Sequence, residues 1–398
     1  MVTYRPLGDE HREAYFEFTK YAFSPSSGPV EYDPEEHDIE RANIGDRRGL
    51  FDDGELKSVC AHHWFDANIR GRYHPAPGLS AVATPPEHRR SGYVTKLLRN
   101  ALEEYRDRGD IVALLWPFRY RFYRQMGWES CADWIRYSCE PSALAFARDE
   151  RDQQGAFRQL DADDFDQISP VYEHYVSEYT LSVTRSDEWW RYRVFESWRT
   201  DPYVYAWEVD GEVRAYLTYV IDGESGERTL QVYDLAYLDL EGLLAILAFL
   251  TNHDSQVTTV TWSLPTDVAV LDLASDPEEI EATLKTGAMA RLVDITRSLP
   301  ALCEPEVDAE VTIEVSDQLV DWNDGTFHLE VSDGETSCEQ RTNDPDARID
   351  IAHLTQLAVG HRSARHLADL HRLDAAESVI DTLDELFPRS QTYLGTGF

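Results

Sequence analysis

The residue types most able to do chemistry lie in one strand–loop–helix stretch, LSAVATPPEHRRSGYVTKLL, at residues 79–98. A helix that begins after Ser91-Gly92 presents backbone N–H groups without intrahelical partners, and its dipole adds partial positive charge. Glycine at this point lets the backbone approach a bulky anion, while Arg89 and Arg90 supply counter-charge. The stretch therefore predicts a cradle for a pyrophosphate, although many helices begin after Ser-Gly and bind nothing.

A second element with chemical potential follows a buried strand predicted at residues 111–116. It reads FYRQMGW, residues 122–128, and Tyr123 within it offers a phenolic hydroxyl. A positioned tyrosine can donate a proton to a leaving group in a transition state. A buried tyrosine can equally be a core residue whose hydroxyl donates to a backbone carbonyl. The residue type alone leaves both interpretations of Tyr123 open.

The elements that must position these residues occur in two similar successions. In each, a helix with apolar periodicity precedes a hairpin with an Asp-Gly turn, then a strand, a second helix and a further strand. The two turns, at Asp53 and Asp210, are each followed by Gly-Glu, and this predicts an internal duplication of one α+β unit. The expected elements are a helix at 11–23, strands at 79–84 and 111–116, a helix from 93 that stops at Gly109, a helix at 164–179, a hairpin at 203–221, a strand at 229–238, a helix at 241–252 and a strand from 257.

A third segment follows, with a different pattern. It offers strands with alternating apolar residues, then helices, and ends in the tail PRSQTYLGTGF, whose last residue is Phe398. Its expected strands lie at 311–316, 327–332 and 347–352, and its expected helices at 354–360, 363–373 and 375–387. The length and this succession predict three domains, at residues 1–147, 148–290 and 291–398.

The paired motifs resemble those of the GNAT N-acetyltransferase superfamily. Its pyrophosphate motif, Arg/Gln-x-x-Gly-x-Gly/Ala, corresponds to Arg89, Gly92 and Val94, and Val94 departs from the pattern because it is not small. The layout of the whole chain resembles the Eis (enhanced intracellular survival) family. The stretches that carry this resemblance are GLSAVATPPEHRRSG, FYRQMGW, SDEWW, ARLVDITRSLPAL and LTQLAVGHRSARHLADLHRL before LDELF. The resemblance implies an α+β fold with two tandem GNAT acyltransferase domains followed by a sterol-carrier-protein-like α/β domain.

The same resemblance implies an activity and a set of site residues. It implies an N-acetyltransferase that uses acetyl-CoA on amines of the aminoglycoside, polyamine or lysine type. Tyr123 would be the general acid, and the terminal carboxylate of Phe398 the general base. Where the family has an acidic residue near the end of the first helix, this chain reads AFSPSS, so the amine subsite is expected to differ. The implied acetyl-CoA contacts are Val82, Ala83, Thr84, Arg89, Arg90, Ser91, Gly92, Tyr93, Val94, Thr95, Phe118 and Arg119.

The second segment lacks the features of this site. Its corresponding helix begins at Asp239-Leu240-Glu241, which places two carboxylates where a pyrophosphate needs positive potential. No Arg-Arg loop and no equivalent of Tyr123 follow. We therefore expect this segment to bind no coenzyme A.

Composition narrows the classes of partner. The chain has 74 acidic and 37 basic residues, a formal net charge of −37 and only four lysines, at positions 20, 57, 96 and 285. This pattern is typical of proteins adapted to molar salt, although an acidic funnel for a cationic substrate is an alternative. A nucleic-acid partner is not expected, because a phosphate backbone needs a basic patch.

Other sequence features concern location and assembly. The chain shows no bilayer-spanning apolar run, no secretory leader and no metal-ligand spacing among its cysteines and histidines, and so predicts a cytoplasmic protein without membrane or metal. The Eis resemblance implies a homo-oligomer, a hexamer in that family. Two other classes stay open: an acyl-CoA-binding sensor without turnover, and a lipid carrier acting through the C-terminal domain.

Overall fold

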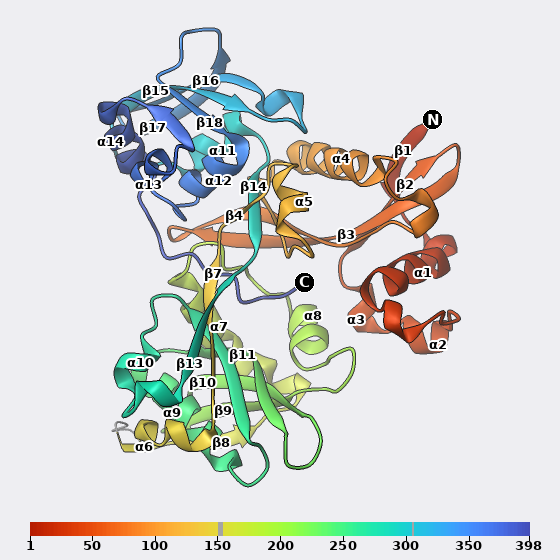
Figure 1. Cartoon of the computed structure of the whole chain (residues 1–398), viewed down its shortest axis with the longest axis vertical. Helices are drawn as coiled ribbons and strands as arrows, with labels where there is room; N and C mark the ends of the chain where they lie inside the picture. The colour runs from red at the N-terminus through yellow and green to blue at the C-terminus, as the bar shows by residue number, and fades with distance from the viewer. Residues whose placement is uncertain (150–153, 305) are drawn as a thin grey trace. The chain divides into compact units, whose positions relative to one another are not determined.

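The computed structural model describes residues 1–149, 154–304 and 306–398, and the chain forms two compact units (Figure 1). The first unit contains residues 1–132, 288–392 and 397–398, and the second contains residues 133–287 and 393–396. Each unit therefore contains segments that are distant in the sequence. No helix of the described residues is long and apolar enough to cross a membrane.

The first unit contains a sheet of seven strands in the order β1-β2-β3-β4-β5-β14-β6. Helix α4 (Tyr93–Arg108) buries its apolar face, including Leu97, Leu98 and Tyr105, against β2, β3 and β4. It ends where predicted, because Gly109 adopts the left-handed conformation that closes a helix. Helix α1 (Arg12–Phe23) also forms where predicted. The strands are β1 (Val2–Pro6), β2 (Asp46–Asp52), β3 (Glu55–Ile69), β4 (Arg72–Ala83), β5 (Val112–Leu115), β6 (Glu129–Ser130) and β14 (Met289–Leu292).

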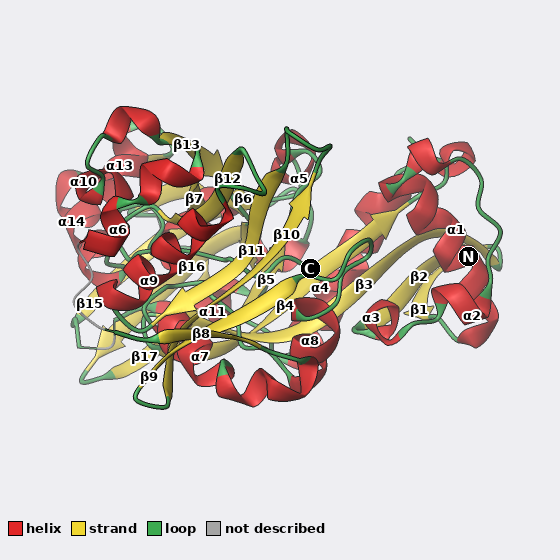
Figure 2. Ribbon diagram, turned by 90° about the horizontal axis from the view of Figure 1, so that it is seen from below, coloured by secondary structure: helices red, strands yellow, loops and turns green. Residues whose placement is uncertain are grey.

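Strand β4 is longer than the sequence pattern predicts, because it begins at Arg72 instead of residue 79. The long β3–β4 hairpin is seen among the yellow strands of Figure 2. Pro75 and Pro77 argue against a strand in this stretch, since proline lacks the N–H that a ladder requires. The two prolines are two residues apart, so both missing N–H groups fall on the same edge of β4. The other edge stays able to pair, and the strand forms.

Two strands pair outside the sheet that their place in the sequence suggests. Strand β7 (Asp133–Cys139) pairs with β12 and β13 in the second unit. Strand β14 inserts between β5 and β6 in the first unit. Local periodicity predicts a strand but not the sheet that it joins. The chain consequently passes from the first unit to the second after residue 132 and returns after residue 287. The domain ranges 1–147, 148–290 and 291–398 stay a sequence-based prediction.

The second unit has a sheet of its own, in the order β13-β7-β12-β11-β10-β9-β8. Its parallel pair β11–β12 is connected through α9 (Leu240–Leu250), as β4 and β5 are connected through α4, and this repeated connection agrees with the predicted duplication. The strands are β8 (Ala156–Gln159), β9 (Tyr203–Val209), β10 (Glu212–Asp222), β11 (Thr229–Tyr237), β12 (Thr259–Pro265) and β13 (Glu281–Thr286), and the longer helices are α7 (Ser169–Ser177) and α9.

The C-terminal part of the first unit adds a five-stranded sheet, ordered β17-β16-β15-β18-β19. Strand β18 ends earlier than predicted, because the carboxylate of Asp350 accepts from the backbone N–H of His353 and starts helix α12. Strand β17 was not predicted, since its polar sequence ETSCEQR gives no apolar alternation. The elements are α11 (Ile295–Leu302), β15 (Ala309–Ser316), β16 (Gly325–Ser332), β17 (Glu335–Arg341), β18 (Ala347–Asp350), α12 (Ile351–Ala358), α13 (Ala364–Asp369), β19 (Leu373–Ala375) and α14 (Glu377–Leu386).

A buried ion pair connects this C-terminal part to the first sheet. Arg291 of β14 is completely buried and pairs with Asp317, which follows β15. Its guanidinium also donates to the carbonyl of Met126 at 2.7 Å and lies over the ring of Trp128. Gly127 is required beside it, since a Cβ there would lie 1.6 Å from the guanidinium and the residue has a φ of +81°. The pair thus fixes the turn at residues 125–127, which follows the short helix α5 (Tyr120–Arg124).

We predict that Arg291→Met lowers the free energy of unfolding by about 3–5 kcal/mol, because it leaves the buried carboxylate of Asp317 without a counter-charge. Urea denaturation of the full chain measures this change. The matched control is Arg99→Met, which removes an exposed ion pair to Asp321 and is expected to cost less than about 1 kcal/mol. Equal losses in the two variants would contradict the role given to Arg291.

Candidate active site

The candidate site begins where β4 and β5 part. Their parallel ladder covers only Gly78 with Leu114 and Leu79 with Leu115 within the described residues. A β-bulge then disturbs β4 opposite Cys60, and Ala81 takes a φ of +52°. Past this bulge, the edge of β4 at Val82 and Ala83 is no longer in the ladder to β5. Backbone groups on such an edge can pair with the amides of an extended ligand.

The loop after β4 has the geometry of an anion cradle. Arg90 and Gly92 both take left-handed φ values, +62° and +76°, and α4 starts directly after Gly92 without a side-chain cap. The first N–H groups of this 16-residue helix therefore have no capping side chain. A Cβ on Gly92 would meet nothing within 4 Å, so its conformation, and not lack of space, favours glycine.

The two arginines of this loop have different surroundings. The Nε of Arg89 donates to the carbonyl of Thr84 at 2.9 Å, and its guanidinium lies over the ring of Tyr21. Arg89 therefore holds the loop against the end of β4. Arg90, Ser91 and Thr95 are exposed, and Tyr93 and Val94 are half-buried at the start of α4. Arg90 is consequently the arginine of the pair that is better placed to meet an anion.

The equivalent helix of the second unit, α9, has an acidic side chain at its start. The carboxylate of Asp239 caps α9 by accepting from the N–H of Gly242 at 3.0 Å. The same carboxylate pairs with Arg214. An acidic side chain thus already occupies the first turn, where an anionic ligand would otherwise be stabilised. This geometry agrees with the expectation that the second segment does not bind coenzyme A.

Tyr123 lies on the short helix α5 (Tyr120–Arg124) and is 4% exposed. Its ring packs against Phe118, Phe122 and Trp128. The core-residue interpretation requires a carbonyl that accepts a hydrogen bond from the Tyr123 hydroxyl. Within the described part of the chain, no carbonyl does so. Burial raises the pKa of Tyr123 well above its ordinary value, so the hydroxyl keeps its proton at neutral pH. Phe118 and Arg119 are exposed just before this helix.

The end of the chain packs beside the point where β4 and β5 part. The ring of Phe398 contacts Phe65, with centroids 5.3 Å apart, and His63, with centroids 5.9 Å apart. A Cβ on Gly78 would lie 2.8 Å from the Phe398 ring, so this glycine makes room for it. Sequence reasoning missed His63, Phe65 and Gly78. The alternation of a strand places His63 and Phe65 on one face, but nothing local shows that the chain terminus covers that face.

Hydrogen bonds hold the tail that leads to Phe398. In the first unit, the N–H of Ser390 donates to the carbonyl of Gly360, and the hydroxyl of Thr392 bonds to the ring of His361 at 2.7 Å. In the second unit, the hydroxyl of Ser182 donates to the carbonyl of Tyr393 at 2.8 Å. There, too, the guanidinium of buried Arg185 donates to Thr396 at 3.0 Å. These bonds order the tail within the described residues.

Comparison with known proteins identifies the class to which this fold and site belong. Models described as "Acetyltransferase (GNAT) domain" match residues 3–131 and 181–292, and a "Sterol carrier protein domain" model matches residues 295–395. An uncharacterized N-acetyltransferase of Streptomyces griseus is 28% identical over 335 residues, which cover 78% of this chain and 79% of that protein. An uncharacterized N-acetyltransferase of Streptomyces avermitilis is 25% identical, with 84% of each chain covered.

Solved structures share the fold over the whole chain. A GCN5-related N-acetyltransferase from Anabaena variabilis superposes with a TM-score of 0.86 at 20% identity, and Eis1 from Mycobacterium abscessus with a TM-score of 0.77 at 24% identity. Both comparisons cover 100% of each chain. The chain is a GNAT N-acetyltransferase, a class that uses an acyl-CoA and acts on an amine. Its GNAT–GNAT–sterol-carrier architecture matches that of the Eis-like N-acetyltransferases, which confirms the predicted family and fold class.

The docking of the tail predicts a dependence of stability on pH. Burial lowers the pKa of His361 from 6.5 to about 3, so the folded protein binds fewer protons than the unfolded chain between these values. Stability is thus complete above about pH 6.5 and falls as the pH drops towards 3, by up to about 1.4 kcal/mol per pH unit for this residue.

Urea denaturation between pH 5 and 7.5, at constant potassium chloride, measures this dependence. We expect His361→Asn to reduce the slope by about one proton and to cost about 1 kcal/mol at pH 7.5 through the lost bond to Thr392. His366→Gln, at an exposed position, is the matched control. An unchanged slope in His361→Asn would contradict the assignment of this pH dependence to His361.

Proposed function

We propose that this protein transfers an acetyl group from acetyl-CoA to an amine, with Tyr123 as general acid and the terminal carboxylate of Phe398 as general base. The observation that carries the proposal is the packing of Phe398 against Gly78, at the point where β4 parts from β5. The terminal carboxylate is attached to a residue that is held next to the opened strand edge. An unanchored tail would offer no such base.

The residues present fit acetyl-CoA. The edge of β4 at Val82, Ala83 and Thr84 offers backbone groups to the amides of the pantetheine arm. The uncapped start of α4, at Ser91 to Thr95, offers N–H groups to the pyrophosphate, and Arg90 adds charge. Arg89 would contribute indirectly, because it holds the loop to Thr84. Phe118 is 68% exposed before α5 and offers an apolar contact, and Arg119 offers a charge.

The proposed reaction is a direct transfer. The carboxylate of Phe398 accepts a proton from the substrate ammonium, directly or through a water molecule. The amine nitrogen then attacks the thioester carbonyl, whose oxygen is stabilised by a backbone N–H of β4. The C–N bond forms and the C–S bond breaks, and the hydroxyl of Tyr123 gives its proton to the departing sulfur. The amine nitrogen loses its second proton to solvent as the neutral amide forms, and solvent returns a proton to Tyr123. The raised pKa of Tyr123 keeps that proton available at neutral pH.

The class of amine is proposed from the architecture and the charge of the chain. The Eis-like architecture favours an aminoglycoside, a polyamine or a lysine side chain as the acceptor, and it favours a homo-oligomer. At residues 22–27, near the end of the first helix, the chain reads AFSPSS and has no acidic residue. The net charge of −37 would attract any of these cations and also suits molar salt. We also propose that the protein is cytoplasmic and adapted to molar salt.

The lipid-carrier alternative has no support in the C-terminal sheet. The cavity described there measures about 210 Å³ and is lined mainly by polar groups, among them Glu310, Thr312, His328 and Asp346. A fatty acyl chain needs an apolar lining of greater extent. The sterol-carrier-like fold here is better explained by its delivery of the tail to the first sheet.

The role of the terminal carboxylate is testable by adding one glycine after Phe398. The extension keeps the aromatic ring but converts the carboxylate into an amide and moves the new carboxylate about 3.8 Å away. We expect kcat to fall about 100-fold or more, with acetyl-CoA binding retained. Thiol release in molar potassium chloride, over a panel of aminoglycosides, polyamines and lysine peptides, measures the rate.

Phe398→Leu is the matched control for this extension, because it keeps the carboxylate and loses only ring contacts. It should retain most of the wild-type kcat. An extended chain with wild-type turnover would show that another group is the base, and the acetyltransferase assignment would stand.

The role of Tyr123 is testable by Tyr123→Phe, which removes the hydroxyl and keeps the ring. We expect kcat to fall about 100-fold, with little change in KM for acetyl-CoA, because the hydroxyl acts only on the leaving thiolate. Tyr137→Phe, which removes another buried hydroxyl, one that donates to Val268, should leave kcat unchanged. An unaltered kcat in Tyr123→Phe would show that Tyr123 is a structural core residue and not the general acid.

A further inference from the structure

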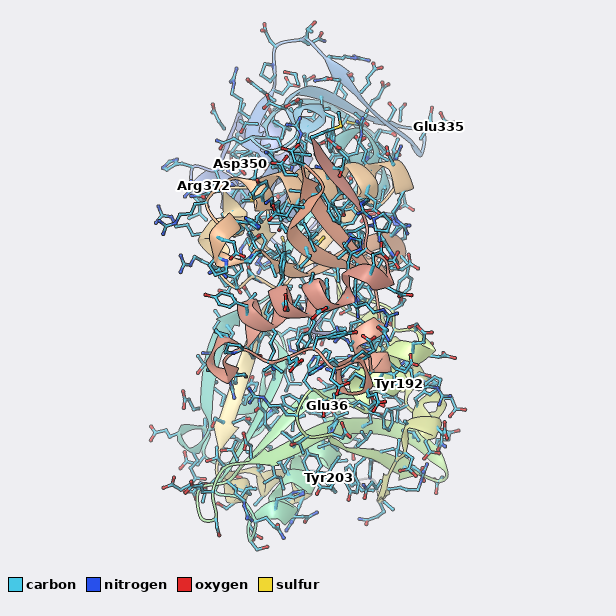
Figure 3. All side chains as sticks on the ribbon, turned by 90° about the vertical axis from the view of Figure 1, so that its right-hand side faces the viewer. Glu36, Tyr192, Tyr203, Glu335, Asp350 and Arg372 are labelled. Atoms are coloured by element: carbon cyan, nitrogen blue, oxygen red, sulfur yellow. The ribbon has the colours of Figure 1, made fainter. Side chains whose placement is uncertain are left out.

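A second cavity of the first unit lies beside α5. It has a volume of about 680 Å³, within the range of small-molecule sites. One wall comes from α5 and the chain that follows it, with Arg121, Arg124 and Glu129. The other wall comes from the C-terminal part, with Asp350, Arg362 and Arg372, and Figure 3 labels Asp350 and Arg372 close together on this wall.

The charge of this lining is opposite to that of the protein. The cavity has four arginines against two carboxylates, whereas the whole chain has twice as many acidic as basic residues. A random sample of this acidic surface would be negative. Arginines that face one another repel unless counter-charge lies between them. An anion bound in this cavity would reduce that repulsion.

The carboxylates of the lining are already engaged. Glu129 is buried and accepts from Nε and Nη2 of Arg124 at 2.9 and 2.8 Å. Both oxygens of Asp350 contact the ring of His353, and one of them also caps α12. Burial alone would raise the pKa of Asp350, but the hydrogen bonds from His353 lower it below its ordinary value, so this group stays charged and paired.

Two arginines on opposite walls of the cavity have charges that the carboxylates of the lining do not neutralise. Within the described residues, neither Arg121 of α5 nor Arg372, just before β19, has an ion pair with a carboxylate. Both side chains line the same cavity and are exposed to it. A guanidinium donates through a planar fork that matches carboxylate and phosphate oxygens two at a time. Two such forks facing one hollow suit a molecule with more than one anionic group.

We propose that this cavity binds a small polyanion carrying phosphate or carboxylate groups, held between Arg121 of the GNAT domain and Arg372 of the sterol-carrier-like domain. The ligand bridges α5 and the C-terminal part and so holds the helix that carries Tyr123. The site is separate from the strand edge of β4 and the start of α4, where acetyl-CoA is proposed to bind. The inference does not depend on the proposed catalytic residues.

The test is calorimetric titration of the full chain at constant ionic strength in potassium chloride. Inorganic pyrophosphate probes phosphate chemistry, and citrate probes carboxylate chemistry. We expect one molecule of at least one probe to bind per chain, and Arg121→Gln and Arg372→Gln each to weaken that binding roughly tenfold. Arg348→Gln, an exposed arginine of β18 outside the cavity, should leave the affinity unchanged.

A second titration, with the protein saturated with coenzyme A, separates the two sites. The affinity for the probe should then stay within about twofold of its value without coenzyme A. Displacement of the probe by coenzyme A would overturn the proposal, since the cavity would belong to the acyl-CoA site. Absence of saturable binding by both probes, or binding unaffected by both cavity variants, would overturn it as well. A loss of acetyl transfer in the variants of Tyr123 or Phe398 has no bearing on these outcomes.

Discussion

The buried guanidinium of Arg291 is the constraint on which the organisation of the first unit depends. A charge removed from water must be paired, and Asp317 is the carboxylate that pairs with it. Because Arg291 belongs to β14 and Asp317 follows β15, the acyltransferase sheet and the C-terminal sheet are joined at this point. The same guanidinium bonds to the turn after α5, so the position of Tyr123 is connected to the presence of the C-terminal domain.

The two acyltransferase domains share a topology but differ in the electrostatics of one helix start. In the first, α4 follows a glycine and has no side-chain cap, so its dipole and N–H groups face outward. In the second, Asp239 caps α9 and is neutralised by Arg214. A cap stabilises a helix by roughly 1 kcal/mol and at the same time removes an anion site. The second domain therefore has a capped helix start where the first has uncapped N–H groups.

The distribution of charge adds a second contrast. With a net charge of −37, the protein repels anions at long range, and this repulsion is screened in concentrated salt. Anionic ligands must then be recognised at short range, by backbone N–H groups and by arginines grouped in one place. The start of α4 and the cavity beside α5 are places in the described part of the first unit where such groups gather. Arginine suits this role because its guanidinium binds oxygens in pairs.

The sequence by itself determined the family, the acyltransferase duplication, α4 with its glycine stop, and Tyr123 on the element after β5, because these are local patterns of periodicity, capping and motif spacing. Only the tertiary structure decided that β7 and β14 join other sheets, that Pro75 and Pro77 lie within β4, and that Arg291 finds Asp317. It also placed Phe398 against Gly78, 320 residues earlier in the chain. Long-range pairing depends on which surfaces remain to be buried after the local elements form, and a local pattern does not contain that information.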